Sequence, residues 1–342
     1  MNLYKSVSKK IFKVGIIGAG LMGNRRALAI KTIGGAKLVA ASDANKHVLS
    51  NYCHLYNCHP TKNWRELVRR NDLDIVIVST PNYLLKPITL KALANGKHVL
   101  VEKPFGRNVA ESKAMIAASK KYRKELKVGL NHRFHAAILD AKKIFDKGGI
   151  GKILFIRSRY GQGGRLGMEK EWRFNKKLSG GGEPLDQGIH IIDLSRYFAG
   201  DFNQVYGSAE SKFWKKGIYD STFMILKNKN ITASLHVSTV QWKNLFSFEV
   251  FGDKGFLDIE GKGGSYGKET LIYGRRKPKF GVPILKKFEY PKDISWEKEW
   301  RHFLNVLKSK EKMTGTPKDG LEANRIVEAV YQSSKTNKVI KL

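Results

Sequence analysis

The sequence predicts an α/β chain with two domains. The first, over residues 1–133, is expected to hold a parallel sheet, because apolar strand-like runs alternate there with helical patterns. The second, over residues 134–342, is expected to be an α+β domain with a large, mostly antiparallel open sheet, because strand-like segments follow one another without helices between them. A chain of 342 residues also suits about two domains.

A glycine-rich turn near the start of the chain is the strongest local signal. An apolar run over residues 13–17 predicts a buried strand, and residues 21–33 predict a helix. Three glycines with G-x-G-x-x-G spacing follow the strand, where they allow a tight turn, close approach of a diphosphate, and helix packing on the strand. This predicts a Rossmann dinucleotide-binding domain whose cofactor contacts Gly18, Gly20, Leu21, Met22 and Gly23.

Asp43 ends the next apolar run, over residues 37–42. An acidic residue about 20 positions after such glycines holds the ribose 2′-hydroxyl. Its carboxylate would repel a 2′-phosphate, so NAD is expected, while nearby Lys46 leaves NADP possible.

The rest of the first domain continues the alternation. Helices are expected over residues 45–57, 63–70, up to 94, and 109–122, and strands over 74–80, 97–101 and 126–130. Ligands of open α/β sheets bind at the carboxyl ends of the strands. The expected cofactor contacts there are Thr80, Pro81, Asn82, Glu102, Lys103 and Asn131.

The second domain begins with a helix over residues 136–145 and a strand over 152–160. Residues 161–182 are glycine-rich and basic, which is long for a loop and suggests a functional or disordered segment. A helix is expected over residues 185–198. Six strand-like segments follow at 204–211, 221–226, 231–239, 247–251, 255–260 and 270–273, and helices at 295–308 and 320–334 close the chain.

The charge is unusual, with 63 Lys+Arg against 30 Asp+Glu and a net charge of +33. Nucleic-acid binding or an acidic small-molecule substrate would each suit it, but the lysines are spread along the chain and form no block of five or six. A solvated lysine-rich surface is therefore favoured, and nucleic acid is a disfavoured partner.

Membrane and metal sites are not expected. The sequence has no run of about 18 apolar residues, and residues 1–10 lack the apolar core of a signal peptide. Cys53-His54 and Cys58-His59 lack a second ligand pair with zinc-like spacing, and two cysteines make no disulfide framework. A cytoplasmic protein without a metal is the expectation.

Two groups of residues suit proton transfer. Lys103, at a strand tip beside the cofactor, could bond a substrate hydroxyl and pass its proton, although a surface lysine is the alternative. Asp186, His190 and Asp193 are spaced i, i+4 and i+7, on one face of a helix. Histidine titrates near neutrality, and a carboxylate one turn away could orient it for proton transfer. The alternatives to this catalytic role are a buried polar network and a metal-binding face.

Four motifs together resemble the glucose–fructose oxidoreductase / inositol dehydrogenase / MocA (Gfo/Idh/MocA) family. They are Gly18-Ala-Gly-Leu-Met-Gly23, Thr80-Pro-Asn82, Gly96-Lys-His-Val-Leu-Val-Glu-Lys-Pro104, and the stretch from Gly180 through Asp186 and His190 to Asp193. The resemblance implies that Lys103 is the active-site lysine, that Asp186 and His190 are the D-x3-H pair, and that the Lys103–Pro104 peptide is often cis. Leu85 departs from the pattern, since many members carry histidine there.

The resemblance also implies hydride transfer between nicotinamide C4 and a carbon that bears a sugar or cyclitol hydroxyl. We assign His190 as general base, Lys103 as the group that bonds the same hydroxyl, and Asp186 as the residue that orients them. The exchange of roles between Lys103 and His190 stays open. A homodimer or homotetramer is implied as well.

The expected substrate is a phosphorylated or nucleotide-linked sugar, with a free sugar or cyclitol next. Arginine binds phosphate in a bidentate manner, and several arginines lie on or near the long loop and the domain junction. Pairing of these arginines with Glu169 or Glu171 is the alternative. The expected substrate contacts are Lys103, Arg133, Tyr160, Arg165, Trp172, Arg173, Asp186 and His190.

Two other functions remain open. Some relatives retain NAD and cleave glycosidic bonds by transient oxidation, and release of sugar from an aryl glycoside without net NADH would reveal this. A non-catalytic dinucleotide-binding regulator would instead bind DNA in a salt-dependent way and reduce no NAD.

Overall fold

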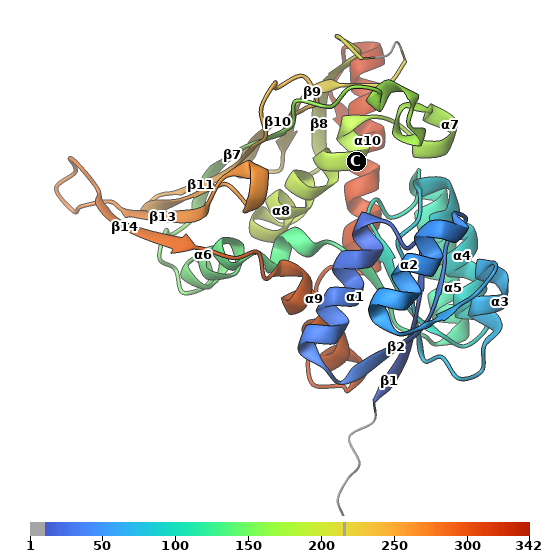
Figure 1. The fold of residues 1–342 in the computed structure, drawn as a ribbon. Helices are drawn as coiled ribbons and strands as arrows, with labels where there is room; N and C mark the ends of the chain where they lie inside the picture. Colours follow the sequence, from blue (N-terminus) through green and yellow to red (C-terminus); the bar gives the residue numbers. More distant parts are fainter. Residues whose placement is uncertain (1–10, 215–216) are drawn as a thin grey trace, which may run out of the picture.

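The structure is a computed structural model that describes residues 11–214 and 217–342. The expectation about residues 1–10 lies outside the described residues. A first sheet of six parallel strands has the order β3-β2-β1-β4-β5-β6 (Figure 1). Its strands are β1 (Phe12–Ile17), β2 (Ala36–Ser42), β3 (His59–Pro60), β4 (Ile75–Val78), β5 (His98–Glu102) and β6 (Leu126–Gly129).

Helices cover both faces of this sheet, because successive strand residues point to opposite sides. In β4, Ile75 and Ile77 join one apolar core, and Val76 and Val78 join the other. Helices α1 (Leu21–Ile33) and α2 (Lys46–Tyr56) contribute to the first core. The second core is covered by α3 (Trp64–Arg69), α4 (Asn82–Ala94) and α5 (Val109–Tyr122).

A second sheet has nine strands in the order β14-β13-β12-β11-β7-β10-β9-β8-β15. Its neighbours are antiparallel except for the parallel pair of β7 and β10, which confirms a mostly antiparallel open sheet. Its strands are β7 (Ile153–Gly161), β8 (Gln204–Glu210), β9 (Ser221–Lys227), β10 (Thr232–Ser238), β11 (Leu245–Gly252), β12 (Gly255–Glu260), β13 (Glu269–Arg275), β14 (Ile284–Tyr290) and β15 (Ile340–Lys341).

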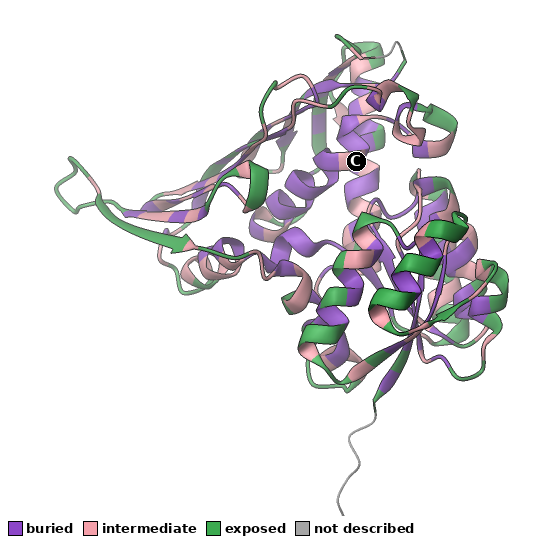
Figure 2. Ribbon diagram, in the orientation of Figure 1, coloured by how far each residue is buried: buried purple, intermediate pink, exposed green. Residues whose placement is uncertain are grey.

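One face of the second sheet is covered by three helices (Figure 1). These are α6 (Ala136–Asp146), α8 (Ile189–Ala199) and α10 (Pro317–Thr336). The strands they cover carry buried residues, whereas β14 is largely exposed (Figure 2). Exposed large apolar side chains on β7, β8 and β9 include Leu154, Phe155, Tyr206 and Phe223.

The end of the chain returns to the first sheet. Helix α9 (Ser295–Leu307) packs on α1, and α10 packs on α5 (Figure 1). The 3-10 turn Asn131–Phe134 spans the proposed boundary at residue 133, so the domain limits stay a prediction. No helix among the described residues is long and apolar enough to cross a membrane.

A buried ion network joins these parts. Arg26 on α1 donates hydrogen bonds to Glu102 at the end of β5 and to Glu299 on α9, each at 2.6 Å. All three side chains are almost fully buried. A second buried cation, Lys127, lies 3.6 Å from the carboxylate of Glu299. The charges therefore compensate each other where water is absent, which fixes the carboxyl end of β5 relative to α1 and α9.

Candidate active site

A cavity of about 880 Å³ lies at the carboxyl edge of the first sheet and is lined from both sheets. Its size and its mixture of apolar and convergent polar side chains are typical of small-molecule sites. Every residue expected to contact the cofactor lines it except Gly23. The lining residues from that set are Gly18, Gly20, Leu21, Met22, Asp43, Thr80, Pro81, Asn82, Glu102, Lys103 and Asn131.

The glycine turn has the geometry that a bound diphosphate needs. Gly18 has φ +97°, and a Cβ on it would lie 2.4 Å from the carbonyl oxygen of Ser79. A Cβ on Gly23 would lie 2.0 Å from the carbonyl oxygen of Gly18, so Gly23 packs behind the turn. Gly20, by contrast, has no atom within 4 Å of its Cβ position and opens on the cavity. The residues present therefore fit a dinucleotide.

Asp43 lines the cavity and is hydrogen-bonded to the same turn. Its carboxylate accepts the backbone N–H of Ala19 at 2.8 Å and that of Asn45 at 2.9 Å. These bonds hold the carboxylate against the cavity wall beside the first glycines. A negative charge fixed there opposes a second negative group, such as a ribose 2′-phosphate.

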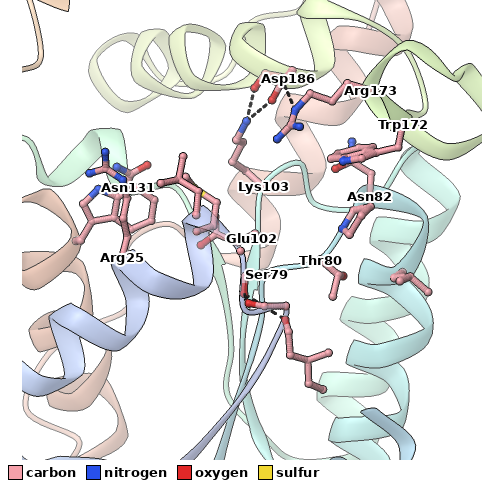
Figure 3. A pocket seen from close by; sticks show the side chains of 18 of the residues that line it. Arg25, Ser79, Thr80, Asn82, Glu102, Lys103, Asn131, Trp172, Arg173 and Asp186 are labelled. Carbon is pink, nitrogen blue, oxygen red and sulfur yellow. Dashed lines mark hydrogen bonds and ion pairs between the residues drawn. The ribbon is translucent and has the colours of Figure 1, made fainter. Parts of the chain in front are cut away.

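Lys103 and Asp186 meet above the glycine turn, although they are 83 positions apart (Figure 3). The Lys103 ammonium donates to the carbonyl oxygen of Asp186 at 2.8 Å and to its Oδ1 at 2.5 Å. Burial raises the pKa of Asp186, but the Lys103 ammonium and the Arg173 guanidinium outweigh it and lower the pKa overall. Asp186 is therefore an anion that orients Lys103. The Lys103–Pro104 peptide is cis.

Asp186 and His190 both line the cavity, but Asp193 does not. A π-helical turn over Pro184–Gly188 precedes α8 and changes the angular spacing of the side chains. Asp193 instead accepts two hydrogen bonds from Arg133, at 2.6 and 2.8 Å, in a buried pair. Of the three polar residues expected on one face, Asp186 and His190 share the cavity. Asp193 belongs to a buried polar network instead.

His190 is held as a neutral imidazole. Its ring stacks on His132 with centroids 3.6 Å apart, and its Nδ1 is buried without a hydrogen-bond partner among the described residues. Burial lowers the pKa of His190 well below its usual value, and the positive charges of Lys103 and Lys262 lower it further. A neutral imidazole can accept a proton at neutral pH.

Six of the eight expected substrate contacts line the cavity, and we call the part that they form the substrate half. They are Lys103, Tyr160, Trp172, Arg173, Asp186 and His190. Trp172 and Arg173 point toward the cavity beside Asp186 (Figure 3). They come from the glycine-rich segment, which forms short helical turns at Met168–Lys170, Trp172–Phe174 and Lys176–Ser179. The segment thus has regular structure and contributes to the cavity lining, and its function stays a prediction.

Two expected substrate contacts lie elsewhere. Arg133 is buried and pairs with Asp193 and with Asp319 at 3.1 Å, outside the cavity lining. Arg165 is exposed and pairs with Glu171, and it does not line the cavity either. Their charges are used in ion pairs within the protein, so we remove both from the proposed substrate contacts.

Several lining residues were not foreseen: Arg25, His132, Gln187, Lys262, Tyr266, Asp293 and Trp296. His132 adjoins the expected Asn131, which is the one local signal for it. The others come from loops and helix faces that approach the cavity through tertiary packing, so no spacing in the sequence marks them. Leu85, the departure from the family pattern, is fully buried in α4.

The cysteine–histidine segment holds no metal site. The sulfur atoms of Cys53 and Cys58 lie 3.3 Å apart as free thiols. No group of three or more His, Cys, Asp or Glu side chains in residues 11–214 and 217–342 could bind a metal ion.

A glycine turn on a six-stranded parallel sheet, with a Lys–Asp pair and a neutral histidine above it, defines a two-domain dinucleotide-dependent oxidoreductase. The comparisons with known proteins agree. Residues 12–130 match the description "Oxidoreductase family, NAD-binding Rossmann fold", and residues 138–258 match "GFO/IDH/MocA C-terminal domain". The chain belongs to the GFO/IDH/MocA family, and its first domain binds NAD.

Relatives with assigned names are similar over different lengths. The chain is 33% identical over 205 residues to levoglucosan dehydrogenase of Pseudarthrobacter phenanthrenivorans, which covers 56% of this chain and about half (52%) of that protein. It is 32% identical to glucose-6-phosphate 3-dehydrogenase of Bacillus subtilis, over 56% of this chain and 55% of that protein. It is 26% identical to myo-inositol 2-dehydrogenase of Thermotoga maritima, over 96% and 98%.

Solved structures share the whole fold. Levoglucosan dehydrogenase in complex with NADH has a TM-score of 0.87 and 22% identity, covering 96% of this chain and 98% of that one. Aldose-aldose oxidoreductase from Caulobacter crescentus, complexed with glycerol, has a TM-score of 0.84 and 26% identity, covering 97% and 100%.

Proposed function

We propose that the protein transfers a hydride between NAD and a carbon that bears a secondary hydroxyl or keto group of a sugar. The observation that carries the proposal is the convergence of Lys103, Asp186 and His190 on the cavity that begins at the glycine turn. Relatives named as sugar and cyclitol dehydrogenases support the substrate class.

The residues divide the proton chemistry between them. The residues of the glycine turn would hold NAD, which would supply a hydride acceptor for the carbinol carbon. His190, which is neutral, accepts the proton of the hydroxyl as general base. Lys103 donates a hydrogen bond to the same oxygen, and Asp186 holds the ammonium in place. The reverse order restores the alcohol, with the proton returned from His190.

The finer substrate assignment is a phosphorylated or nucleotide-linked sugar. Arg133 and Arg165 lie outside the cavity lining, so these two arginines do not support phosphate binding there. The substrate half of the cavity still carries the positive charges of Lys103, Arg173 and Lys262. The relative named glucose-6-phosphate 3-dehydrogenase gives independent support for a phosphorylated sugar.

A substrate panel tests this function. Sugars, cyclitols, sugar phosphates and nucleotide-sugars are each supplied with NAD and, separately, with NADP, and reduced nicotinamide is followed by its absorbance. We expect turnover with at least one class and a preference for NAD, because the Asp43 carboxylate stands where a 2′-phosphate would be repelled. No reduction by any member would reject the proposal, and a strong NADP preference would reject the role of Asp43.

The acid limit of activity should lie below pH 6.5. The general base must be neutral, and the pKa of His190 is lowered below its usual value by burial first and then by Lys103 and Lys262. Activity is therefore retained as the pH falls through 6.5 and is lost only at more acid pH, where the imidazole protonates. A profile of log kcat/KM against pH checks this, and a limb at or above pH 6.5 would contradict it.

We propose that the protein is a homodimer or homotetramer. The uncovered face of the second sheet exposes Leu154, Phe155, Tyr206 and Phe223, and apolar groups of this size favour burial against another surface. Light scattering after size-exclusion chromatography should give a multiple of the 38.7 kDa chain mass. A monomer at micromolar concentration would contradict the proposal.

A further inference from the structure

A second lysine, Lys262, faces the substrate half of the cavity. It lies in the loop between β12 and β13, and its side chain lines the cavity. Its ammonium nitrogen is 4.0 Å from the centre of the Tyr266 ring and 5.6 Å from that of Tyr160. The Tyr160 ring lies 6.2 Å from the ring of His190, so Tyr160 is a common neighbour of Lys262 and the proposed general base.

Lys262 has no counter-ion among the described residues, unlike Lys103, Arg173 and Arg25, which also line the cavity. Lys103 and Arg173 lie 2.5 and 3.7 Å from carboxylate oxygens of Asp186. Arg25 pairs with Asp293 at 3.8 Å. Within residues 11–214 and 217–342, no carboxylate forms an ion pair with Lys262. A partly buried ammonium with no anion is unfavourable, and the two aromatic rings compensate it only in part.

We propose that Lys262 determines substrate specificity by binding an anionic substituent of the sugar, either a phosphate ester or a carboxylate. The inference rests on the proposed function, because it places the sugar beside Lys103 and His190. An anion on the substrate would supply the counter-ion that the protein lacks at this position. Its bond to the ammonium would be charge-assisted, which is among the stronger hydrogen bonds.

The ionisation of Lys262 is consistent with this role. Burial lowers its pKa to about 8, while Asp293 and Glu269 favour the charged form and Arg25 and Lys103 oppose it. The phenol groups of Tyr160 and Tyr266 also face it. Lys262 is thus mostly charged at pH 7, and the preference for an anionic sugar should decline as the pH rises through 8.

Equilibrium binding to the NADH complex tests the inference without requiring turnover. The fluorescence of bound NADH is followed as glucose, glucose 6-phosphate or glucuronate is added to the full-length protein. The variants are Lys262→Met, which removes the charge and keeps much of the aliphatic length, and Lys262→Arg, which keeps the charge. Lys268→Met is the matched control, because Lys268 is exposed and pairs with Glu289 outside the cavity.

We expect the wild type to bind at least one anionic probe about tenfold or more tightly than glucose, as a charge-assisted bond implies. Lys262→Met should abolish that ratio with little change for glucose, Lys262→Arg should keep most of it, and Lys268→Met should leave it unchanged. The probe that binds more tightly distinguishes a phosphate ester from a carboxylate.

Three results would overturn the inference. They are equal losses for charged and neutral sugars in Lys262→Met, no preference for either anionic probe in the wild type, and a loss of NADH affinity with unchanged sugar discrimination. The last would place the ammonium on the cofactor diphosphate. Failure of the proposed redox function would show separately, as anionic-sugar binding without NADH formation in the substrate panel.

Discussion

Replacement of Lys103 or His190 by alanine is expected to lower kcat by about 100-fold or more, the usual size of a general acid–base contribution. The ammonium that bonds the reacting oxygen is lost in the first variant, and the neutral imidazole that accepts its proton is lost in the second. Neither side chain shapes the glycine turn, so the affinity for NADH should stay near that of the wild type. Steady-state rates and NADH fluorescence titrations measure the two quantities.

The control for the lysine variant is Lys113→Ala, an exposed position on α5 far from the cavity lining. It should retain normal turnover. Near-normal turnover in both Lys103→Ala and His190→Ala would reject the assignment. The pH profile of the surviving activity separates the two roles. Loss of His190 removes the acid limb, whereas loss of Lys103 keeps the limb and moves it to higher pH, because the Lys103 ammonium lowers the pKa of His190.

Arg26→Met is expected to cost about 3–5 kcal/mol of unfolding free energy, since it leaves the buried carboxylate of Glu102 without its cation and that of Glu299 with Lys127 alone. Arg26 is bonded to Glu102 and Glu299 at 2.6 Å, and all three are almost fully buried. Urea unfolding followed by tryptophan fluorescence measures the loss. Arg301→Met, at an exposed position on the same helix as Glu299, should change stability by no more than about 0.5 kcal/mol.

The destabilisation of Arg26→Met should depend on pH. Burial already raises the pKa of Glu102, and removal of the guanidinium raises it further. A carboxyl group with a raised pKa in the folded state binds more protons than in the unfolded state, so stability falls as the pH rises above the unfolded value. The loss should therefore be larger at pH 8 than at pH 5. An equal loss at both would show that packing, not uncompensated charge, explains the effect.

Local patterns predicted most of the helices and strands of both domains. The helix of residues 21–33 and the strand of residues 255–260 were predicted with the bounds that the structure has. Hydrophobic periodicity succeeds there because each element buries one face or both. It fails for β14, whose residues are nearly all exposed, and for the two-residue strands β3 and β15, which are too short to show a period.

The residues of the site were harder to predict from the sequence. The glycine turn, Lys103 and the Asp186–His190 pair have fixed local spacing, and the structure brings them to one cavity. Lys262 comes from a loop that reaches the cavity only through the packing of the second sheet. Arg133 was predicted as a substrate contact because it lies at the domain junction, yet its burial against Asp193 depends on α8. When the role of a side chain depends on partners far away in the sequence, no local spacing of residues indicates that role.

A crystal structure of the protein with bound NADH would show where the cofactor lies relative to Lys103 and His190. We expect the diphosphate on the turn from Gly18 to Gly23 and nicotinamide C4 facing both side chains, with space for one carbinol group between them. A diphosphate bound away from that turn, or a nicotinamide ring remote from either side chain, would contradict this expectation.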